Sequence, residues 1–184
     1  SRCRQNRNRY VNFTGVIFVS WRGGRIFWYI FIMKNYLILL DGPKGAGKST
    51  LSALLETKLS NTKFFSIDKE RNSLKRTDSI KDDNERAFQA ILEKLKDVFK
   101  QGKNAVVDCG VTERRLGVLE TIVKEYNVVF YKFSLTAPYN VLRSRVEERA
   151  KAKGKKFDLE RFDVIHKALN AKSFDDFYML DSDK

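Results

Sequence analysis

The stretch Gly42-Pro43-Lys44-Gly45-Ala46-Gly47-Lys48-Ser49-Thr50 decides the fold of this chain. It satisfies the pattern G-x-x-x-x-G-K-[S/T], in which glycines let successive backbone N–H groups point at phosphate oxygens. A continuous apolar run over 36–40 precedes the pattern, and leucines at helical spacing follow it within 48–59. The pattern therefore lies between a strand and a helix, where a phosphate-binding loop is expected. The sequence predicts a nucleotide-binding P-loop over 42–50.

Two side chains of this loop have chemistry beyond that of the backbone. Lys48 is expected to reach the β- and γ-phosphates, and the Ser49 hydroxyl is expected to ligate Mg²⁺. The predicted binding set is the whole loop, Gly42, Pro43, Lys44, Gly45, Ala46, Gly47, Lys48, Ser49 and Thr50. We therefore expect ATP and Mg²⁺ as cofactors.

Beyond the loop, short apolar strands alternate with amphipathic helices along the chain. Strands are predicted over 36–40, 64–67, 105–108, 128–135 and 177–180, and helices over 48–59, 83–100, 113–126, 139–151 and 158–171. Such alternation favours a parallel sheet with right-handed crossovers and helices on both faces. The fold class predicted is α/β, a P-loop NTPase fold with a parallel sheet of about five strands and a helical lid.

The first 32 residues differ from the rest of the chain. They carry six arginines and no acidic residue, and so account for +6 of the formal charge of +13. Their apolar runs are too short to span a bilayer. We expect 1–32 to be a basic and apolar extension without an independent domain, and 33–184 to be the domain that contains the P-loop.

The cysteines and the net charge narrow the setting and the partners. Cys3 and Cys109 lie far apart and the chain has one histidine, which argues against a disulfide framework and a zinc cluster. A reducing, cytoplasmic location is the default expectation. Because Lys and Arg number 36 against 23 acidic residues, the expected partners are anionic, namely nucleotides, nucleic acid or phosphorylated metabolites. No membrane is expected, because the apolar runs are too short to span one.

The strand ends favour a kinase among the P-loop proteins. Asp108 is followed by Cys109, not by the Glu typical of motor proteins, and no Asn-Lys-x-Asp element of GTPases occurs. A kinase needs a carboxylate near the acceptor hydroxyl, and Asp68 follows the second predicted strand at a suitable place. The alternative is that Asp68 is the N-cap of a helix over 69–74.

Four stretches resemble the kinase domain of the bacteriophage 5′-hydroxyl polynucleotide kinases and related small P-loop kinases. They are Gly42 to Thr50, Phe64 to Arg71 with an Asp-x-x-Arg pair, Val107-Asp108 with Thr112 to Leu116 and Glu120 to Tyr126, and Leu142 to Arg149. The resemblance covers nearly all of 34–170. It implies that Asp68 is the general base, that Arg71 holds a phosphate of the acceptor strand and that Arg149 stabilises the transferring phosphoryl group.

Two further assignments come from spacing and position. Arg145 and Arg149 are four apart on a predicted helix, so they share a face from which a lid could cover the triphosphate; the alternative is an exposed face paired with Glu147 and Glu148. Asp108 could orient the acceptor or hold Mg²⁺ through water, or it could simply cap the next turn.

Some residues depart from the family pattern or have structural explanations. Cys109-Gly110-Val111 stands where phage relatives commonly carry a polar Thr-Asn pair, which leaves the acceptor contacts there open. Cys109 is expected to be a packing residue, and His166 to lie at the core edge or on the surface.

Three functions remain open from sequence. The first is an ATP-dependent kinase acting on a 5′-hydroxyl of RNA or DNA. The second is a small-molecule kinase of the zeta-toxin, gluconate or antibiotic phosphotransferase type. The third is a nucleotide-binding regulatory module without acceptor-dependent turnover.

Overall fold

The computed structural model describes residues 19–22, 25–28, 34–170 and 176–183, and it divides the chain into two units, 1–34 and 35–184. In the first unit, strand β1 (Val19–Arg22) pairs antiparallel with β2 (Arg25–Trp28). Neither strand was predicted from the sequence. That 1–32 forms no independent domain stays a prediction.

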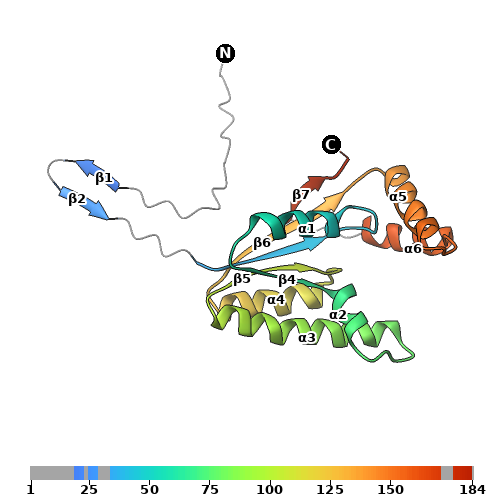
Figure 1. The fold of residues 1–184 in the computed structure, drawn as a ribbon, viewed down its shortest axis with the longest axis horizontal. Coiled ribbons are helices and arrows are strands. Elements are labelled where there is room, and N and C mark those ends of the chain that lie inside the picture. The colour runs from blue at the N-terminus through green and yellow to red at the C-terminus, as the bar shows by residue number, and fades with distance from the viewer. Residues whose placement is uncertain (1–18, 23–24, 29–33, 171–175, 184) are drawn as a thin grey trace, which may run out of the picture. The chain divides into compact units, whose positions relative to one another are not determined.

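The second unit is built on a five-stranded sheet in which every neighbouring pair is parallel. The strand order is β4-β5-β3-β6-β7 (Figure 1). The strands are β3 (Tyr36–Asp41), β4 (Thr62–Ser66), β5 (Asn104–Asp108), β6 (Val129–Thr136) and β7 (Tyr178–Asp181). The predicted α/β fold with five parallel strands is confirmed.

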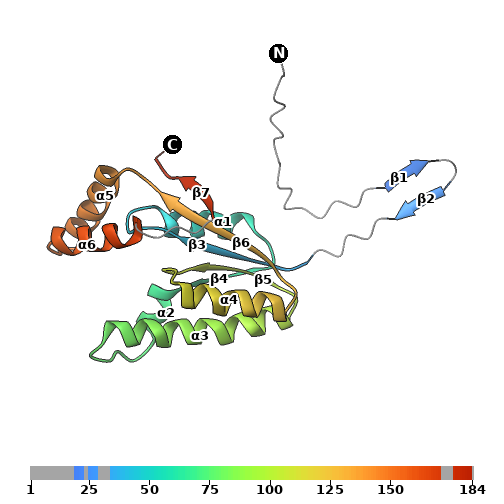
Figure 2. The ribbon, with the colours of Figure 1, turned by 180° about the vertical axis from the view of Figure 1, so that it is seen from behind.

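The described residues of the second unit form six helices besides the sheet. They are α1 (Lys48–Lys58), α2 (Ile67–Ser73), α3 (Ile80–Lys100), α4 (Glu113–Glu125), α5 (Tyr139–Ala152) and α6 (Leu159–Asn170). Helices α3 and α4 cover one face and α1 the other, whereas α5 and α6 lie beyond the carboxyl ends of the strands (Figures 1 and 2). No helix in the described part of the chain is long and apolar enough to cross a membrane.

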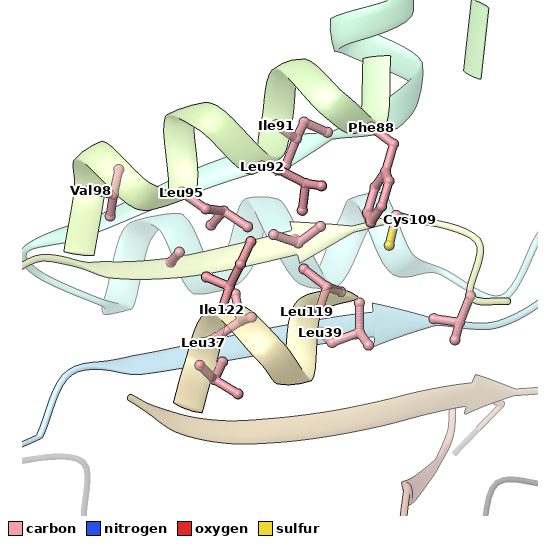
Figure 3. Close-up of a cluster of buried hydrophobic side chains, with 14 of the residues drawn as sticks. Leu37, Leu39, Phe88, Ile91, Leu92, Leu95, Val98, Cys109, Leu119 and Ile122 are labelled. Atoms are coloured by element: carbon pink, nitrogen blue, oxygen red, sulfur yellow. The ribbon is translucent and has the colours of Figure 1, made fainter. Parts of the chain in front are cut away.

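The central strand β3 is buried on both faces of the sheet, and its side chains alternate between two core clusters. Leu37 and Leu39 belong to the cluster formed with α3 and α4, which also contains Phe88 and Leu119 (Figure 3). Ile38 and Leu40 belong to a second cluster that includes side chains of α1, α5 and α6. This continuous apolar run was the signal that placed the strand from sequence.

Helix α3 begins three residues before the predicted start, at Ile80. The Ser79 hydroxyl accepts a hydrogen bond from the Asp82 N–H at 3.2 Å and so caps the helix. The buried carboxylate of Asp83 accepts hydrogen bonds from the backbone N–H and the hydroxyl of Thr77, at 3.0 and 2.9 Å. These bonds attach the segment before α3 to its first turn.

Candidate active site

The loop between β3 and α1 has the backbone geometry that its glycines allow. Gly45 and Gly47 have φ of 88° and 85°, in the left-handed region that favours glycine. A Cβ at Gly45 would lie 2.8 Å from the Leu142 carbonyl oxygen, and one at Gly42 would lie 2.4 Å from that of Leu135. Both positions therefore require glycine, because the loop lies directly against β6 and α5.

The N-terminus of α1 is left open to an anion. Its N-cap is Gly47, no side chain caps the helix, and its first turn has no acidic residue. The first N–H groups of a helix have no partner within it and carry partial positive charge. The Lys48 ammonium lies inside the loop and donates to the carbonyl oxygens of Gly42 and Pro43, at 2.7 and 3.2 Å. The loop thus fits a phosphate group.

Ser49 and Asp108 supply oxygen donors beside Lys48. Burial raises the pKa of the Asp108 carboxyl, while the nearby Lys48 charge and a hydrogen bond with Ser49 act in the opposite direction. No group of three or more His, Cys, Asp or Glu residues that could hold a metal occurs within the described ranges. Hard oxygen donors suit Mg²⁺, which usually completes its shell with water and substrate phosphates. The residues fit Mg²⁺ bound together with a nucleotide.

Asp68 lies in the first turn of α2, where it is the second residue of the helix. The N-cap is Ser66, so the alternative assignment of Asp68 as an N-cap is wrong. The Arg71 guanidinium donates to Asp68 Oδ1 at 2.8 Å and to Asn84 Oδ1 at 2.7 Å. Because the Asp68 side chain is 79% exposed, its carboxylate is held in place by Arg71 and remains open to a substrate.

The two arginines of α5 that were predicted to cover the triphosphate have different surroundings. The half-buried Arg145 guanidinium donates to Gly45 O at 3.3 Å, to Ser182 Oγ at 3.1 Å and to Ser182 O at 3.0 Å, and lies 3.7 Å from an Asp183 carboxylate oxygen. It therefore joins α5 to the P-loop and to the residues after β7, an arrangement that neither sequence interpretation foresaw. Arg149 is exposed, one turn further along the same helix.

Three clefts meet at the P-loop, and we name them by the helices beside them. The α1–α5 cleft, of about 950 Å³, is lined by Gly47, Thr50, Arg145 and Arg149 among others. The α2 cleft, of about 670 Å³, is lined by groups that include Lys48, Asp68, Arg71 and Asp108. The α5–α6 cleft, of about 530 Å³, is lined by groups that include Pro43, Lys44, Asp68, Arg71 and Arg149.

The structure thus brings together the predicted residues from separate parts of the chain. Lys48, Asp68 and Asp108 share the α2 cleft, and Asp68 also borders the α5–α6 cleft. Ala46 is fully buried and belongs to the cluster that includes side chains of α1, α5 and α6. The assignment of catalytic and binding roles to these residues remains a prediction.

Sequence reasoning missed several residues that support the site. The buried Asp41 ends β3 and accepts a hydrogen bond from the Val111 N–H at 3.1 Å, which fixes the loop after β5. Arg115 donates to Glu85 Oε1 at 2.7 Å and lies over the Phe88 ring. An acidic residue at the end of the P-loop strand was a usable signal for Asp41. Arg115 offered none, because its partners lie about 30 residues away.

Cys109 and His166, which were expected to have structural roles, both lie among packed side chains. Cys109 is buried in the cluster with α3 and α4, and burial raises the pKa of its thiol to about 12. His166 lies half-buried among aromatic rings, 5.0 Å from the Tyr139 ring and 6.0 Å from that of Phe162.

The fold and the loop together define a P-loop kinase-like domain. The chain belongs to the AAA domain family, whose model matches residues 37–171. The matched range begins in β3 and extends through α6, so it contains the P-loop, α2 and α5.

Solved structures with the same fold have diverse names. A candidate kinase from Chloroflexus aurantiacus is 14% identical with a TM-score of 0.67, over 82% of this chain and 89% of that one. A gluconokinase from Sinorhizobium meliloti is 18% identical with a TM-score of 0.55, over 81% and 83%. A chain of the Pnkp1/Rnl/Hen1 RNA repair complex is 20% identical with a TM-score of 0.59, over 74% of this chain but 44% of that one. No curated protein matches the chain.

Proposed function

We propose that this protein is an ATP-dependent kinase that transfers the γ-phosphoryl group of ATP to a 5′-hydroxyl of a polynucleotide. The observation that carries the proposal is Asp68, an exposed carboxylate held by Arg71 at the edge of a cleft that also contains Lys48. A regulatory module that only binds nucleotides has no need for such a carboxylate.

In this mechanism the acceptor hydroxyl oxygen attacks the γ-phosphorus, the bond from that phosphorus to the β,γ-bridging oxygen breaks, and ADP leaves. Asp68 accepts the hydroxyl proton. Lys48 and the N-terminus of α1 hold the charged phosphate oxygens, and Arg149 bears on the same group from the lid. Mg²⁺, held by Ser49 with Asp108 nearby, would neutralise charge on the phosphates.

The choice of acceptor rests on charge and likeness. Residues 33–184 retain a formal charge of +7 without the arginine-rich extension, which suits an anionic strand. The likeness to phage polynucleotide kinases over 34–170 and to a chain of an RNA repair complex supports the same choice. The gluconokinase likeness supports the second candidate, a kinase for small molecules, which would use the same loop, Asp68 and lid.

The deciding experiment follows the transfer of radiolabelled γ-phosphate to 5′-hydroxyl DNA and RNA oligonucleotides and to a panel of sugars and antibiotics. Asp68→Asn keeps the side-chain size but removes the base, so kcat should fall by about 10²–10⁴ with ATP affinity unchanged. Asp97→Asn, at an exposed position of α3, is the control and should keep wild-type activity.

The outcomes separate the candidates. Labelled oligonucleotides, with the loss confined to the Asp68 variant, would support the proposal. Labelling of a sugar or antibiotic alone would show that the acceptor is a small molecule and not a polynucleotide, and it would support the proposed kinase activity. Full activity of Asp68→Asn would remove the assigned base.

A further inference from the structure

The α5–α6 cleft has a strong excess of positive charge. Seven Lys and Arg side chains line it, against the two carboxylates of Asp68 and Asp158. Four of the cations come from the segment that joins α5 to α6 and from the first turn of α6: Lys153, Lys155, Lys156 and Arg161. Among the described side chains, none forms an ion pair with any of these four.

Both carboxylates of the cleft already have partners. Asp68 is bound by Arg71, and the Asp158 carboxylate accepts a hydrogen bond from the Arg161 backbone N–H at 2.9 Å, which caps α6. Because seven cations line the cleft against these two carboxylates, the positive charge of Lys153, Lys155, Lys156 and Arg161 is not fully neutralised within it.

The backbone that carries these lysines is fixed at both ends. The N–H groups of Lys153 and Lys155 donate to the Ala150 carbonyl oxygen at 3.1 and 2.9 Å, and Gly154 has a φ of 62°, so α5 ends in a tight turn. Directly after Lys156, the Phe157 ring packs 5.8 Å from the ring of the buried Phe162. The four cations thus lie along a defined wall of the cleft.

The position of this wall relates it to the acceptor. Asp68 and Arg71 line the same cleft as these cations, so a ligand whose reacting hydroxyl lies at Asp68 has room to extend along the cleft toward Lys153 and Arg161. The phosphates of ATP have their own partners in Lys48 and the N-terminus of α1. A sugar or sugar acid carries at most one charge, which would leave most of the four cations unmatched, whereas a nucleic acid strand supplies one phosphate per nucleotide.

We infer that Lys153, Lys155, Lys156 and Arg161 bind successive phosphates of the acceptor strand beyond its 5′-terminal nucleotide. This inference rests on the proposed function and deepens it, because it makes a strand of several nucleotides, and not a single nucleoside, the preferred acceptor. The segment between α5 and α6 then recognises the acceptor, in addition to the part that α5 is proposed to play in covering ATP.

The test replaces Lys153, Lys155 and Lys156 together by Gln in the full chain. Binding is measured by fluorescence anisotropy of 3′-labelled, single-stranded 5′-hydroxyl oligonucleotides of one to eight nucleotides, at several salt concentrations. A matched control replaces Lys58, Lys63 and Lys151 by Gln, since these lysines are exposed and line none of the three clefts.

The wild type should bind longer oligonucleotides more tightly, and the cleft variant should lose most of this length dependence. Loss of three phosphate contacts should flatten the slope of log K against log salt by about 2, from about 0.7 per contact on a single strand. The KM for the longest oligonucleotide should rise, with kcat at saturation and ATP affinity unchanged. The control variant should show none of these changes in length dependence or KM.

Two results would overturn the inference: equal length dependence and salt slope in the cleft and control variants, or no oligonucleotide binding by the wild type. In the first case, phosphorylation of oligonucleotides would leave the proposed function standing. Binding that needs the three lysines, without any phosphorylation of the strand, would keep the cleft as a strand-binding surface and overturn both the proposed acceptor and the assignment of these lysines to an acceptor strand.

Discussion

The charge of Lys48 lies inside its own loop. Its ammonium donates to two carbonyl oxygens of its own loop, Gly42 O and Pro43 O. Lys48→Ala should abolish phosphoryl transfer, because loss of this charge costs several kcal/mol of transition-state stabilisation. Thermal unfolding should change little, since the side chain is not part of the core. Initial rates of γ-phosphate transfer, with Lys58→Ala as control, check this prediction, and an active Lys48 variant would contradict it.

Cys109 should be unreactive in the folded protein. Burial raises the pKa of its thiol to about 12, and the thiolate is the form that reacts with alkylating agents. In a Cys3→Ser variant we expect no labelling by iodoacetamide at pH 8 without denaturant and full labelling in guanidinium chloride, as measured by mass spectrometry. Rapid labelling of the native variant would show that the carboxyl end of β5 opens to solvent.

At the residue level, sequence reasoning could place residues whose positions depend on a local pattern. The loop motif places Lys48 and Ser49 after Gly47, and Asp68 and Arg71 are three apart on one helix and contact each other. The hydrogen bonds of Arg145 could not be predicted, because its partners Gly45 and Ser182 lie 100 and 37 residues away in the sequence. Long-range polar contacts of this kind leave no periodic signal.

Helix α3 depends on an acidic residue at its start. Hydrogen bonds from Thr77 are the main cause that holds the pKa of the Asp83 carboxyl below its usual value. A depressed pKa stabilises the fold above the unfolded-state pKa of about 3.9, and this contribution is lost as pH falls through the lower folded-state pKa. Asp83→Asn should therefore lower Tm at pH 7, and the difference from wild type should shrink below about pH 4.

Differential scanning calorimetry between pH 3 and pH 7 measures this effect. Asp82→Asn is the control, because Asp82 is the exposed neighbour in the same helical turn. A pH-independent difference between wild type and Asp83→Asn would assign the loss to packing instead of charge.

At the element level, the apolar runs located all five strands of the sheet within a few residues. The start of α3 was missed, because its cap Ser79 and the buried Asp83 belong to a polar stretch that resembles a loop. Strand order was also beyond the sequence, since β3 pairs with β5 and β6 and not with β4, its successor in the second unit. Burial on both faces gives neighbouring strands the same pattern and leaves no signal of which strands pair.

At the scale of the whole molecule, we predict that the domain does not need the extension over 1–32. The P-loop, all three clefts and both core clusters are formed by residues of the second unit, 35–184. A protein comprising 33–184 should therefore fold and keep most of its nucleotide affinity. Isothermal titration with ATP and circular dichroism, compared with the full chain, check this expectation. An insoluble or unfolded product would show that the apolar runs of 1–32 contribute to the core.

The strand order also bears on how the protein is made on the ribosome. Leu37 of β3 pairs with Ala105 and Phe130, which are synthesised 68 and 93 residues later. A strand this far from its partners in sequence cannot be ordered early, because the entropy of closing long loops must be overcome first. At about 5–20 residues per second, the emerging β3 waits several seconds for both neighbours. During that interval the leucines of β3 lack their partners in the sheet, and the loop that follows β3 is among the last parts of the second unit to reach its final form.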